Sequence, residues 1–362
     1  MNLPEELIIK ILLRLPVKSL VRFKCVCKSW LSLISDPQFA KSHFELASKH
    51  THRLIYIAAS DARSIDYEAP LHDDSAVANL NFPLDPPIYF VQIMGSCRGF
   101  LLLKNELNLF LWNPSTGFLK PLTLSRSCEI SSNVNVVPTL YGFGFDPLTD
   151  DFLVVLGSYV PSAAGLVTHF EYLSLKTNSW KKVAGSELPY VNPIDEPGAG
   201  VLLNDAIHWI AFRLDEWVGV ILAFDLEEKS LREVPMPGGI HFVFCDLVVL
   251  GGSLCLCYTG IDSVEIWLMK QYRVRSSWTK SIVLSVADIL TNTFSPICFT
   301  KGGEIVGLDG CTGLVKFNHK GELLGQRDYS PDWPECKVAV CTETLLSLPP
   351  SIHQGEAGFS YT

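Results

Sequence analysis

From about residue 51 onward the chain is a series of similar β-rich units, and this recurrence strongly limits the folds open to it. Short apolar runs alternate with turns rich in Gly, Pro, Asn and Asp, while helical periodicity is nearly absent. Each unit alone would be a small sheet with two apolar faces. It must therefore stack on neighbouring units to exclude water.

Five such units can be recognised, with a period of roughly 45–60 residues that falls near the period of propeller blades. They begin near Gly95, Tyr141, Gly200, Leu247 and Ile297. A sixth unit could combine a C-terminal strand, Lys337–Cys341, with an N-terminal strand, Arg53–Ala58, so the number of blades stays open. Because a closed ring leaves few exposed sheet edges, the sequence predicts an all-β, kelch-like β-propeller over residues 49–350. Residues 351–362 are polar and are predicted to be a flexible tail.

The first 48 residues have a different, helical pattern. Apolar residues recur at helical spacing over residues 3–15, and Pro16 ends this helix. A second helical stretch has its apolar positions at Leu20, Phe23, Val26, Cys27 and Trp30. Asp36 and Pro37 then cap and begin a third segment that runs to about Leu46. The sequence thus predicts a small all-α domain of three helices, too small to bury all its apolar faces without a partner.

Charge is divided unevenly between these two parts. The whole chain has a net charge of −9; residues 1–50 contain eight basic and four acidic residues, a net charge of +4, which leaves −13 for the rest. A basic head favours an acidic protein partner, and an acidic body disfavours nucleic acid.

Several features bear on the compartment. The opening MNLPEELIIK has acidic residues where a secretory signal would have basic ones. The most membrane-like stretch, 242–258, is interrupted by Asp246 and split by Gly251 and Gly252, so a buried hairpin is expected there, with no membrane contact. The eleven cysteines form no CxxC motif and are odd in number. Free thiols in the cytoplasm and/or nucleus are therefore expected.

No motif for catalysis, a cofactor or a metal is complete. Gly251-Gly252-Ser253-Leu254-Cys255 fails the last position of a nucleophile elbow, and no phosphate-binding loop is present. His50 and His52 lack a third metal ligand. Cys255 and Cys257 would share one face of a strand, which indicates core positions.

The helical segment closely resembles the F-box. The resemblance rests on the Leu3-Pro4 opening, the Arg14-Leu15-Pro16-Val17 junction, Val26-Cys27-Lys28 with Trp30, and the ending Asp36-Pro37 with Phe39. It implies docking on a small Skp-type adaptor that binds a cullin. The residues that would contact the adaptor or support the contact surface are Leu3, Pro4, Leu7, Ile8, Ile11, Leu12, Leu15, Pro16, Leu20 and Val26. Whether each of them is a contact or a core residue stays open.

The body resembles the F-box-associated domain of the large plant F-box family. The motifs are Gly95-Ser96-Cys97-Arg98-Gly99, Leu111-Trp112-Asn113-Pro114-Ser115-Thr116, Gly142-Phe143-Gly144-Phe145-Asp146-Pro147, and His208 followed by Trp209. The chain departs from the family at Arg98-Gly99-Phe100, where Asn-Gly-Leu is frequent, and the departure is expected to change a turn or surface side chain. The resemblance implies that this domain recruits the protein to be ubiquitinated.

Together these features predict a substrate-receptor subunit of an SCF-type E3 ubiquitin ligase that has no chemical step of its own. The chain lacks the Zn-ligand pattern of a RING, so its partners would supply the chemistry. The alternatives are a propeller adaptor without a role in degradation and a propeller enzyme acting on a small molecule. Four loops form the hypothetical substrate surface: 160–165, 190–198, 215–218 and 237–241.

Overall fold

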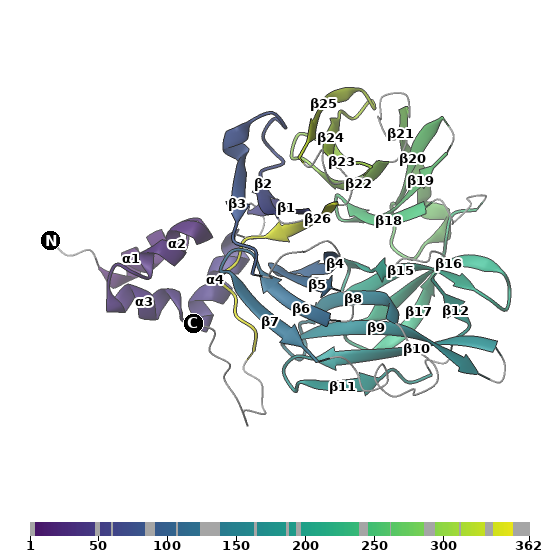
Figure 1. Cartoon of the computed structure of the whole chain (residues 1–362), viewed down its shortest axis with the longest axis horizontal. Helices are drawn as coiled ribbons and strands as arrows, with labels where there is room; N and C mark the ends of the chain where they lie inside the picture. The colour runs from purple at the N-terminus through teal and green to yellow at the C-terminus, as the bar shows by residue number, and fades with distance from the viewer. Residues whose placement is uncertain are drawn as a thin grey trace.

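The protein consists of a small helical domain followed by a ring of β-sheets, which Figure 1 shows with the helices on the left. The computed structural model describes residues 4–47, 51–58, 61–83, 91–105, 108–123, 138–162, 165–185, 188–192, 197–238, 245–260, 262–285, 294–310, 313–329 and 336–349. The predicted tail at 351–362 lies outside the described residues.

Within the described residues the helical domain has four helices, so the prediction of three was wrong. The helices are α1 (Glu5–Leu12), α2 (Val17–Phe23), α3 (Lys28–Ile34) and α4 (Pro37–Ala47). The second predicted stretch breaks after Lys24, and Cys27 is extended, with φ −160° and ψ 164°. Cysteine and valine, which occupy positions 25–27, are weak helix formers. The break lets Trp30 turn back onto Phe23, with ring centroids 5.3 Å apart.

Asp36 caps the last helix as predicted. Its Oδ1 accepts hydrogen bonds from the backbone N–H groups of Gln38 and Phe39, at 2.9 and 3.0 Å. These bonds satisfy two backbone N–H groups in the first turn of α4 that have no acceptor inside the helix. Pro37 has no backbone N–H and therefore needs no acceptor. The cap fixes where α4 starts and hence how it lies on the other helices.

The described strands form six sheets, called blades 1 to 6. Blade 1 contains β4 (Val91–Cys97), β5 (Phe100–Asn105), β6 (Asn108–Asn113) and β7 (Phe118–Leu122). Blade 2 contains β8 (Pro138–Asp146), β9 (Asp151–Ser162), β10 (Gly165–Ser174) and β11 (Ser179–Lys182), with β13 (Gly198–Ala199) parallel to β8. Blade 3 contains β12 (Tyr190–Val191), β14 (Val201–Leu203), β15 (Ala206–Arg213), β16 (Val218–Asp225) and β17 (Ser230–Val234).

Blade 4 contains β18 (Cys245–Leu250), β19 (Ser253–Thr259), β20 (Ser263–Met269) and β21 (Trp278–Ser285). Blade 5 contains β22 (Phe294–Phe299), β23 (Ile305–Asp309), β24 (Gly313–Phe317) and β25 (Leu323–Asp328). Blade 6 contains β26 (Cys336–Thr342), β1 (His52–Ala58), β2 (Asp61–Ile65) and β3 (Val77–Leu80). Short 3-10 helices η1 (Asp74–Ala76) and η3 (Arg275–Ser277) precede β3 and β21.

Blade 6 closes the ring with strands from the two distant ends of the propeller sequence. β26 pairs antiparallel with β1, from His52 opposite Thr342 to Ala58 opposite Cys336. The possible sixth unit is thereby confirmed, and the number of blades is six. β26 also contacts the innermost strands of its two neighbours, β4 and β22.

The hairpin expected near residues 242–258 is confirmed for its described part. β18 and β19 pair around Gly251 and Gly252, whose φ values are +56° and +76°. Among the described residues no helix is long and apolar enough to cross a membrane.

The four-stranded pattern gives the ring two distinct faces. In blades 1, 2, 4 and 5 the turn between the first and second strands and the turn between the third and fourth lie on the same side, because neighbouring strands are antiparallel. In blade 3 the corresponding turns are those between β14 and β15 and between β16 and β17, and in blade 6 β26 ends and β1 begins on this side. This side contacts the helical domain, since Arg98, in the first turn of blade 1, lies over the Phe44 ring of α4. The remaining turns and the connections between blades start on the opposite side, which we call the distal face.

The family-like motifs hold blades 2 and 3 together. The Trp209 indole Nε1 donates to the Tyr141 carbonyl at 2.8 Å, and Trp209 is almost fully buried. A Cβ atom at Gly142 or Gly200 would lie 2.7 or 2.6 Å from the Trp209 ring. Glycine is needed at both positions because the neighbouring backbone approaches the indole so closely.

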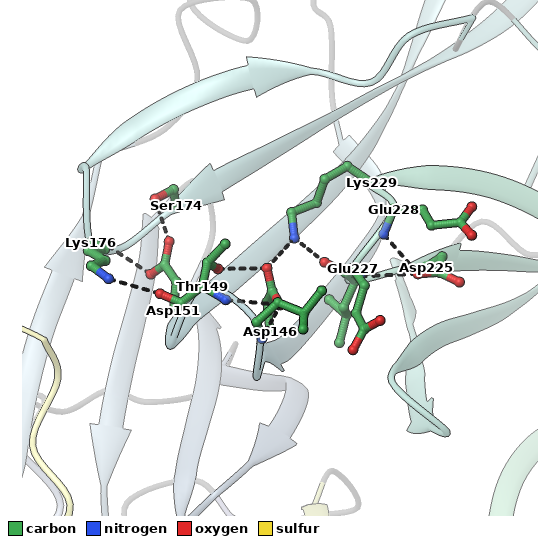
Figure 2. A network of polar contacts seen from close by, with 11 residues as sticks. Asp146, Thr149, Asp151, Ser174, Lys176, Asp225, Glu227, Glu228 and Lys229 are labelled. Atoms are coloured by element: carbon green, nitrogen blue, oxygen red, sulfur yellow. Dashed lines mark hydrogen bonds and ion pairs between the residues drawn. The ribbon is translucent and has the colours of Figure 1, made fainter.

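Figure 2 shows a polar connection between the same two blades. The Asp146 side chain is only 1% exposed, and its Oδ2 accepts from the Thr149 hydroxyl and the Lys229 ammonium, each at 2.6 Å. Its Oδ1 accepts from the Leu148 N–H at 2.9 Å. Burial alone would raise the pKa of Asp146, but the hydrogen bonds from Lys229, Thr149 and Leu148 prevail and lower it.

We predict that Lys229→Met lowers the free energy of unfolding, because Asp146 would keep a buried charge with one partner fewer. Breaking a fully buried pair costs ~3–5 kcal/mol, and since Lys229 is 21% exposed we expect about 2 kcal/mol. Urea unfolding at pH 7 measures the difference.

The pH dependence provides a second test of this pair. A lowered pKa stabilises the fold above the unfolded value of about 3.9, and the contribution is lost as pH falls further. The gap between wild type and Lys229→Met should therefore shrink below about pH 4. Lys182→Met, at an exposed strand end, is the matched control and should stay near wild type. Equal stability of Lys229→Met and wild type at pH 7 would contradict the prediction.

Candidate functional site

The helical domain exposes an apolar face on its first helix. Leu7 and Ile11 are 45% and 51% exposed, and with Pro4 they occupy one side of α1 at spacings of three and four residues. Val26, in the break between α2 and α3, is 60% exposed, and Leu31 of α3 is 47% exposed. So much exposed apolar surface on so small a unit indicates a protein interface.

The remaining predicted site residues lie behind this face or at its edge. Leu12 and Leu20 are buried in the core of the helical domain, while Ile8 and Leu15 pack against that core and are partly buried. Pro16 is exposed at the start of α2, and Leu3 lies outside the described residues. The nine described residues of this set thus divide into exposed and supporting side chains, and the contact of all ten with an adaptor stays a prediction.

His43 is a core residue of the helical domain that the sequence pattern did not reveal. Its imidazole is fully buried, and Nε2 lies 2.8 Å from the Leu15 carbonyl oxygen. The ring also stacks on Phe39 at 6.5 Å between centroids. His43 therefore connects α4 to the residues just after α1 and helps to set the orientation of the exposed face.

A C-terminal strap, residues 343–349, connects the helical domain to the propeller. Leu345 is 8% exposed and belongs to the core of the helical domain, although more than 300 positions separate it from most members of that core. Leu346 packs against both this core and the cluster between blades 1 and 2. Asn113 Nδ2 lies 3.4 Å from the carbonyl oxygens of Thr344 and Leu346, and the Ser115 hydroxyl accepts from the Thr344 N–H at 3.2 Å.

Arg98 lies at the same junction. Its guanidinium is 3.9 Å from the Phe145 ring centroid in blade 2 and 5.1 Å from that of Phe44 in α4. A guanidinium between two aromatic rings is favourable, and more so when it is shielded from water. The departure from the family pattern does fall in a turn, with φ +50° at Arg98, but the side chain bridges the two domains. The next residue, Gly99, has no room for a side chain, because a Cβ atom there would lie 2.2 Å from the Thr344 side chain.

A cavity of about 900 Å³ lies beside this junction, between the helical domain and blade 6. Cationic and anionic side chains both line it, including Lys10, Arg14, Lys301, Glu68 and Glu343. Arg53 is paired with Asp66 at 2.9 Å along the same wall. With both signs of charge represented, the cavity favours no single class of ligand.

The described residues contain no cluster of three or more His, Cys, Asp or Glu side chains placed to hold a metal ion. His52 lies 3.1 Å from the Thr342 hydroxyl, and His50 is outside the described residues. Cys255 and Cys257 are buried, as predicted. Burial also raises the pKa of Cys255 to about 12, which disfavours the reactive thiolate.

The four hypothetical substrate loops start or end at the distal face. The loop 160–165 joins β9 to β10, and 215–218 joins β15 to β16. Tyr190 pairs with Arg213 at the distal end of β15, and Pro237 follows β17. Residues 163–164, 193–196 and 239–241 lie outside the described residues.

Comparisons with known proteins agree with this geometry. The F-box domain family matches residues 1–42, and the F-box associated beta propeller domain family matches residues 49–316. This chain belongs to the F-box proteins. F-box protein CPR1 of Arabidopsis thaliana is 30% identical over 350 residues, which cover 89% of this chain and 83% of that protein. F-box/kelch-repeat protein At3g23880 of the same plant is 30% identical over 334 residues, 88% of each chain.

Among solved structures, a chain of the nidogen/laminin complex aligns with a TM-score of 0.50 at 10% identity, over 81% of this F-box protein and 99% of that chain. At so low an identity the likeness concerns the fold alone. The exposed apolar face of α1 therefore belongs to the F-box, and the six-bladed ring is the F-box-associated propeller.

We predict that Leu345→Ala loosens the F-box helices although residue 345 follows the last propeller strand. Removing a large buried apolar side chain costs about 2–4 kcal/mol. Amide hydrogen exchange should become faster in α1 to α4, while exchange in blades 3 and 4 stays unchanged. Leu323→Ala, at a position that is 40% exposed on β25, is the control and should alter neither region. Unchanged protection of the four helices would show that the strap does not stabilise the F-box.

Proposed function

We propose that this F-box protein is the substrate-receptor subunit of an SCF-type E3 ubiquitin ligase. The observation that supports this most directly is the exposed apolar side of α1, formed by Pro4, Leu7 and Ile11, which the propeller leaves uncovered. In this proposal it binds a Skp-type adaptor, and the adaptor links the chain to a cullin-RING ligase. The net charge of +4 in residues 1–50 suits an acidic adaptor.

The mechanism in this proposal is proximity. The propeller binds a target protein while the F-box binds the adaptor, which raises the effective concentration of target lysines near the ubiquitin-loaded enzyme. The strap and the position of Arg98 between Phe44 and Phe145 favour one orientation of the two domains. The protein performs no bond-breaking step itself and requires no cofactor or metal in this role.

Two finer points belong to the same proposal. Free thiols such as those of Cys97, Cys255, Cys257, Cys298 and Cys341 suit the reducing cytoplasm and/or nucleus. The kelch-like character of the blades stays a prediction from the repeat period.

The decisive experiment is co-elution of the full chain with a plant Skp-type adaptor in gel filtration. We predict a stable complex with wild type and its loss in the double variant Leu7→Asp, Ile11→Asp. A carboxylate in an apolar interface costs several kcal/mol, so affinity should fall at least about 100-fold. Leu15 is unsuited to this test because it packs against the F-box core.

Leu324→Asp is the matched control, since Leu324 of β25 is 51% exposed, as Ile11 is, but lies in blade 5. It should co-elute like wild type, and circular dichroism should show all variants folded. A folded wild type that does not bind the adaptor would refute the proposal, as would undiminished binding by the double variant. Accumulation of a captured target upon proteasome inhibition separates a degradative receptor from a non-degradative adaptor.

A further inference from the structure

The turn between β15 and β16 presents an unusually exposed aromatic side chain. Trp217 is 75% exposed, the highest value among the large apolar side chains of the described residues. Its ring makes a T-shaped contact with Phe212, at 5.7 Å between centroids, so part of the indole is supported while most of the side chain faces solvent. A tryptophan this exposed buries little apolar area within the monomer, and tryptophan is enriched where proteins bind partners.

The surroundings of Trp217 are acidic. The Arg213 guanidinium forms ion pairs with three carboxylates: with Glu216, with Glu233 at 2.7 Å, and with Asp215 at 3.5 Å. One positive charge against three negative ones leaves an excess of two negative charges around Arg213, at the strand end that leads into the turn of Trp217. Asp215 and Glu216 are 57% and 63% exposed, so water and a partner can still reach both.

Another tryptophan of the same propeller, Trp267, shows how a cation can bind to an indole ring and a carboxylate together. In blade 4 the Lys280 ammonium lies 5.4 Å from the Trp267 ring centroid and 2.8 Å from a Glu265 carboxylate oxygen. The Trp267 Nε1 donates to the other oxygen of Glu265 at 3.0 Å. Trp217 likewise follows two carboxylates in its turn, Asp215 and Glu216, but no Lys or Arg of the described residues lies over its ring.

We infer that Trp217, with Asp215 and Glu216, is a recognition element for a Lys or Arg side chain in an extended basic segment of the target protein. The cation would lie on the indole face and the carboxylates would orient it, as Lys280 lies on Trp267. The net charge of −13 outside residues 1–50 would speed the approach of such a segment. The inference deepens the proposed function, because it names the chemistry of the target.

The position of the turn suits this role. It lies on the distal face of blade 3, and blade 3 is opposite blade 6, beside which the F-box lies (Figure 1). An adaptor on α1 therefore leaves Trp217 accessible.

The test uses an array of 15-residue peptides of varied sequence, probed with the full chain at 150 mM salt. Selected peptides should be enriched in Lys and Arg, and the best of them is then titrated by fluorescence anisotropy. Trp217→Ala should weaken binding about 5–30-fold, the range expected for losing a largely desolvated cation–π contact. Trp217→Phe should retain part of the affinity, since phenylalanine is a weaker cation acceptor. Asp215→Asn with Glu216→Gln should weaken binding and reduce its salt dependence.

Leu148→Ala is the matched control, because Leu148 is 74% exposed but lies in the first turn of blade 2, on the side of the F-box. It should bind the same peptide as wild type. The inference is overturned if the selected peptides are not enriched in Lys and Arg, or if Trp217→Ala binds them as tightly as wild type. The second outcome would mean that the acidic surface attracts cations without the ring.

The outcome is separable from that of the proposed function. If the wild type binds the adaptor but selects no basic peptides, the receptor proposal stands and the Trp217 inference fails. If it selects them in a Trp217-dependent way but binds no adaptor, the propeller is a peptide-binding module outside the ubiquitin system.

Discussion

The pairing of β26 with β1 is the interaction on which the rest of the structure depends. Seven residue pairs, from His52–Thr342 to Ala58–Cys336, join strands from opposite ends of the propeller sequence. Without this pairing blade 6 would lose its innermost strand, and β4 and β22 would lose the neighbour they share. The apolar faces of the adjoining blades would then be open to water. The closure also brings the chain after Thr342 back to the F-box.

The strap, residues 343–349, links the closure of the ring to the packing of the F-box helices. Because Thr342 pairs with His52, the residues that follow it meet the F-box helices, where Leu345 completes their core. The Glu343 N–H bonds to the Thr51 carbonyl at 3.0 Å and so attaches the strap at the start of β1. Arg98 adds a contact from blade 1, between Phe44 and Phe145. F-box orientation and ring closure are thus parts of one arrangement, and the proposed receptor role, which works by proximity, would benefit from such a fixed geometry.

Much of the fold could be predicted from local patterns, while the junction could not. Alternating strand units and their turns are local, and even the partner strands of blade 6 could be proposed, since each lacked a complete sheet. The break between α2 and α3 was missed because the weak helix formers at 25–27 are too few to outweigh the apolar spacing from Leu20 to Trp30, and the contact of Trp30 with Phe23 that the break allows has no local signal. His43 and Leu345 gave no signal, and Arg98 was noticed only as a departure from the family pattern, because the roles of all three depend on contacts with residues far away in sequence. Helical periodicity located the apolar positions of α1, but only the packing of the other helices separates exposed Ile11 from buried Leu12.

In the proposed role, charge and geometry together constrain where a target would bind and which of its lysines would receive ubiquitin. The head and body have net charges of opposite sign, +4 over residues 1–50 and −13 beyond, so an acidic adaptor and a basic target would be drawn to different parts of the molecule. A basic target segment brings several lysines at once. The lysine held against Trp217, Asp215 and Glu216 would be shielded from an incoming enzyme. In the proposed role, ubiquitin would therefore be attached at other lysines, at a distance from the segment set by the orientation that Arg98 and Leu345 favour.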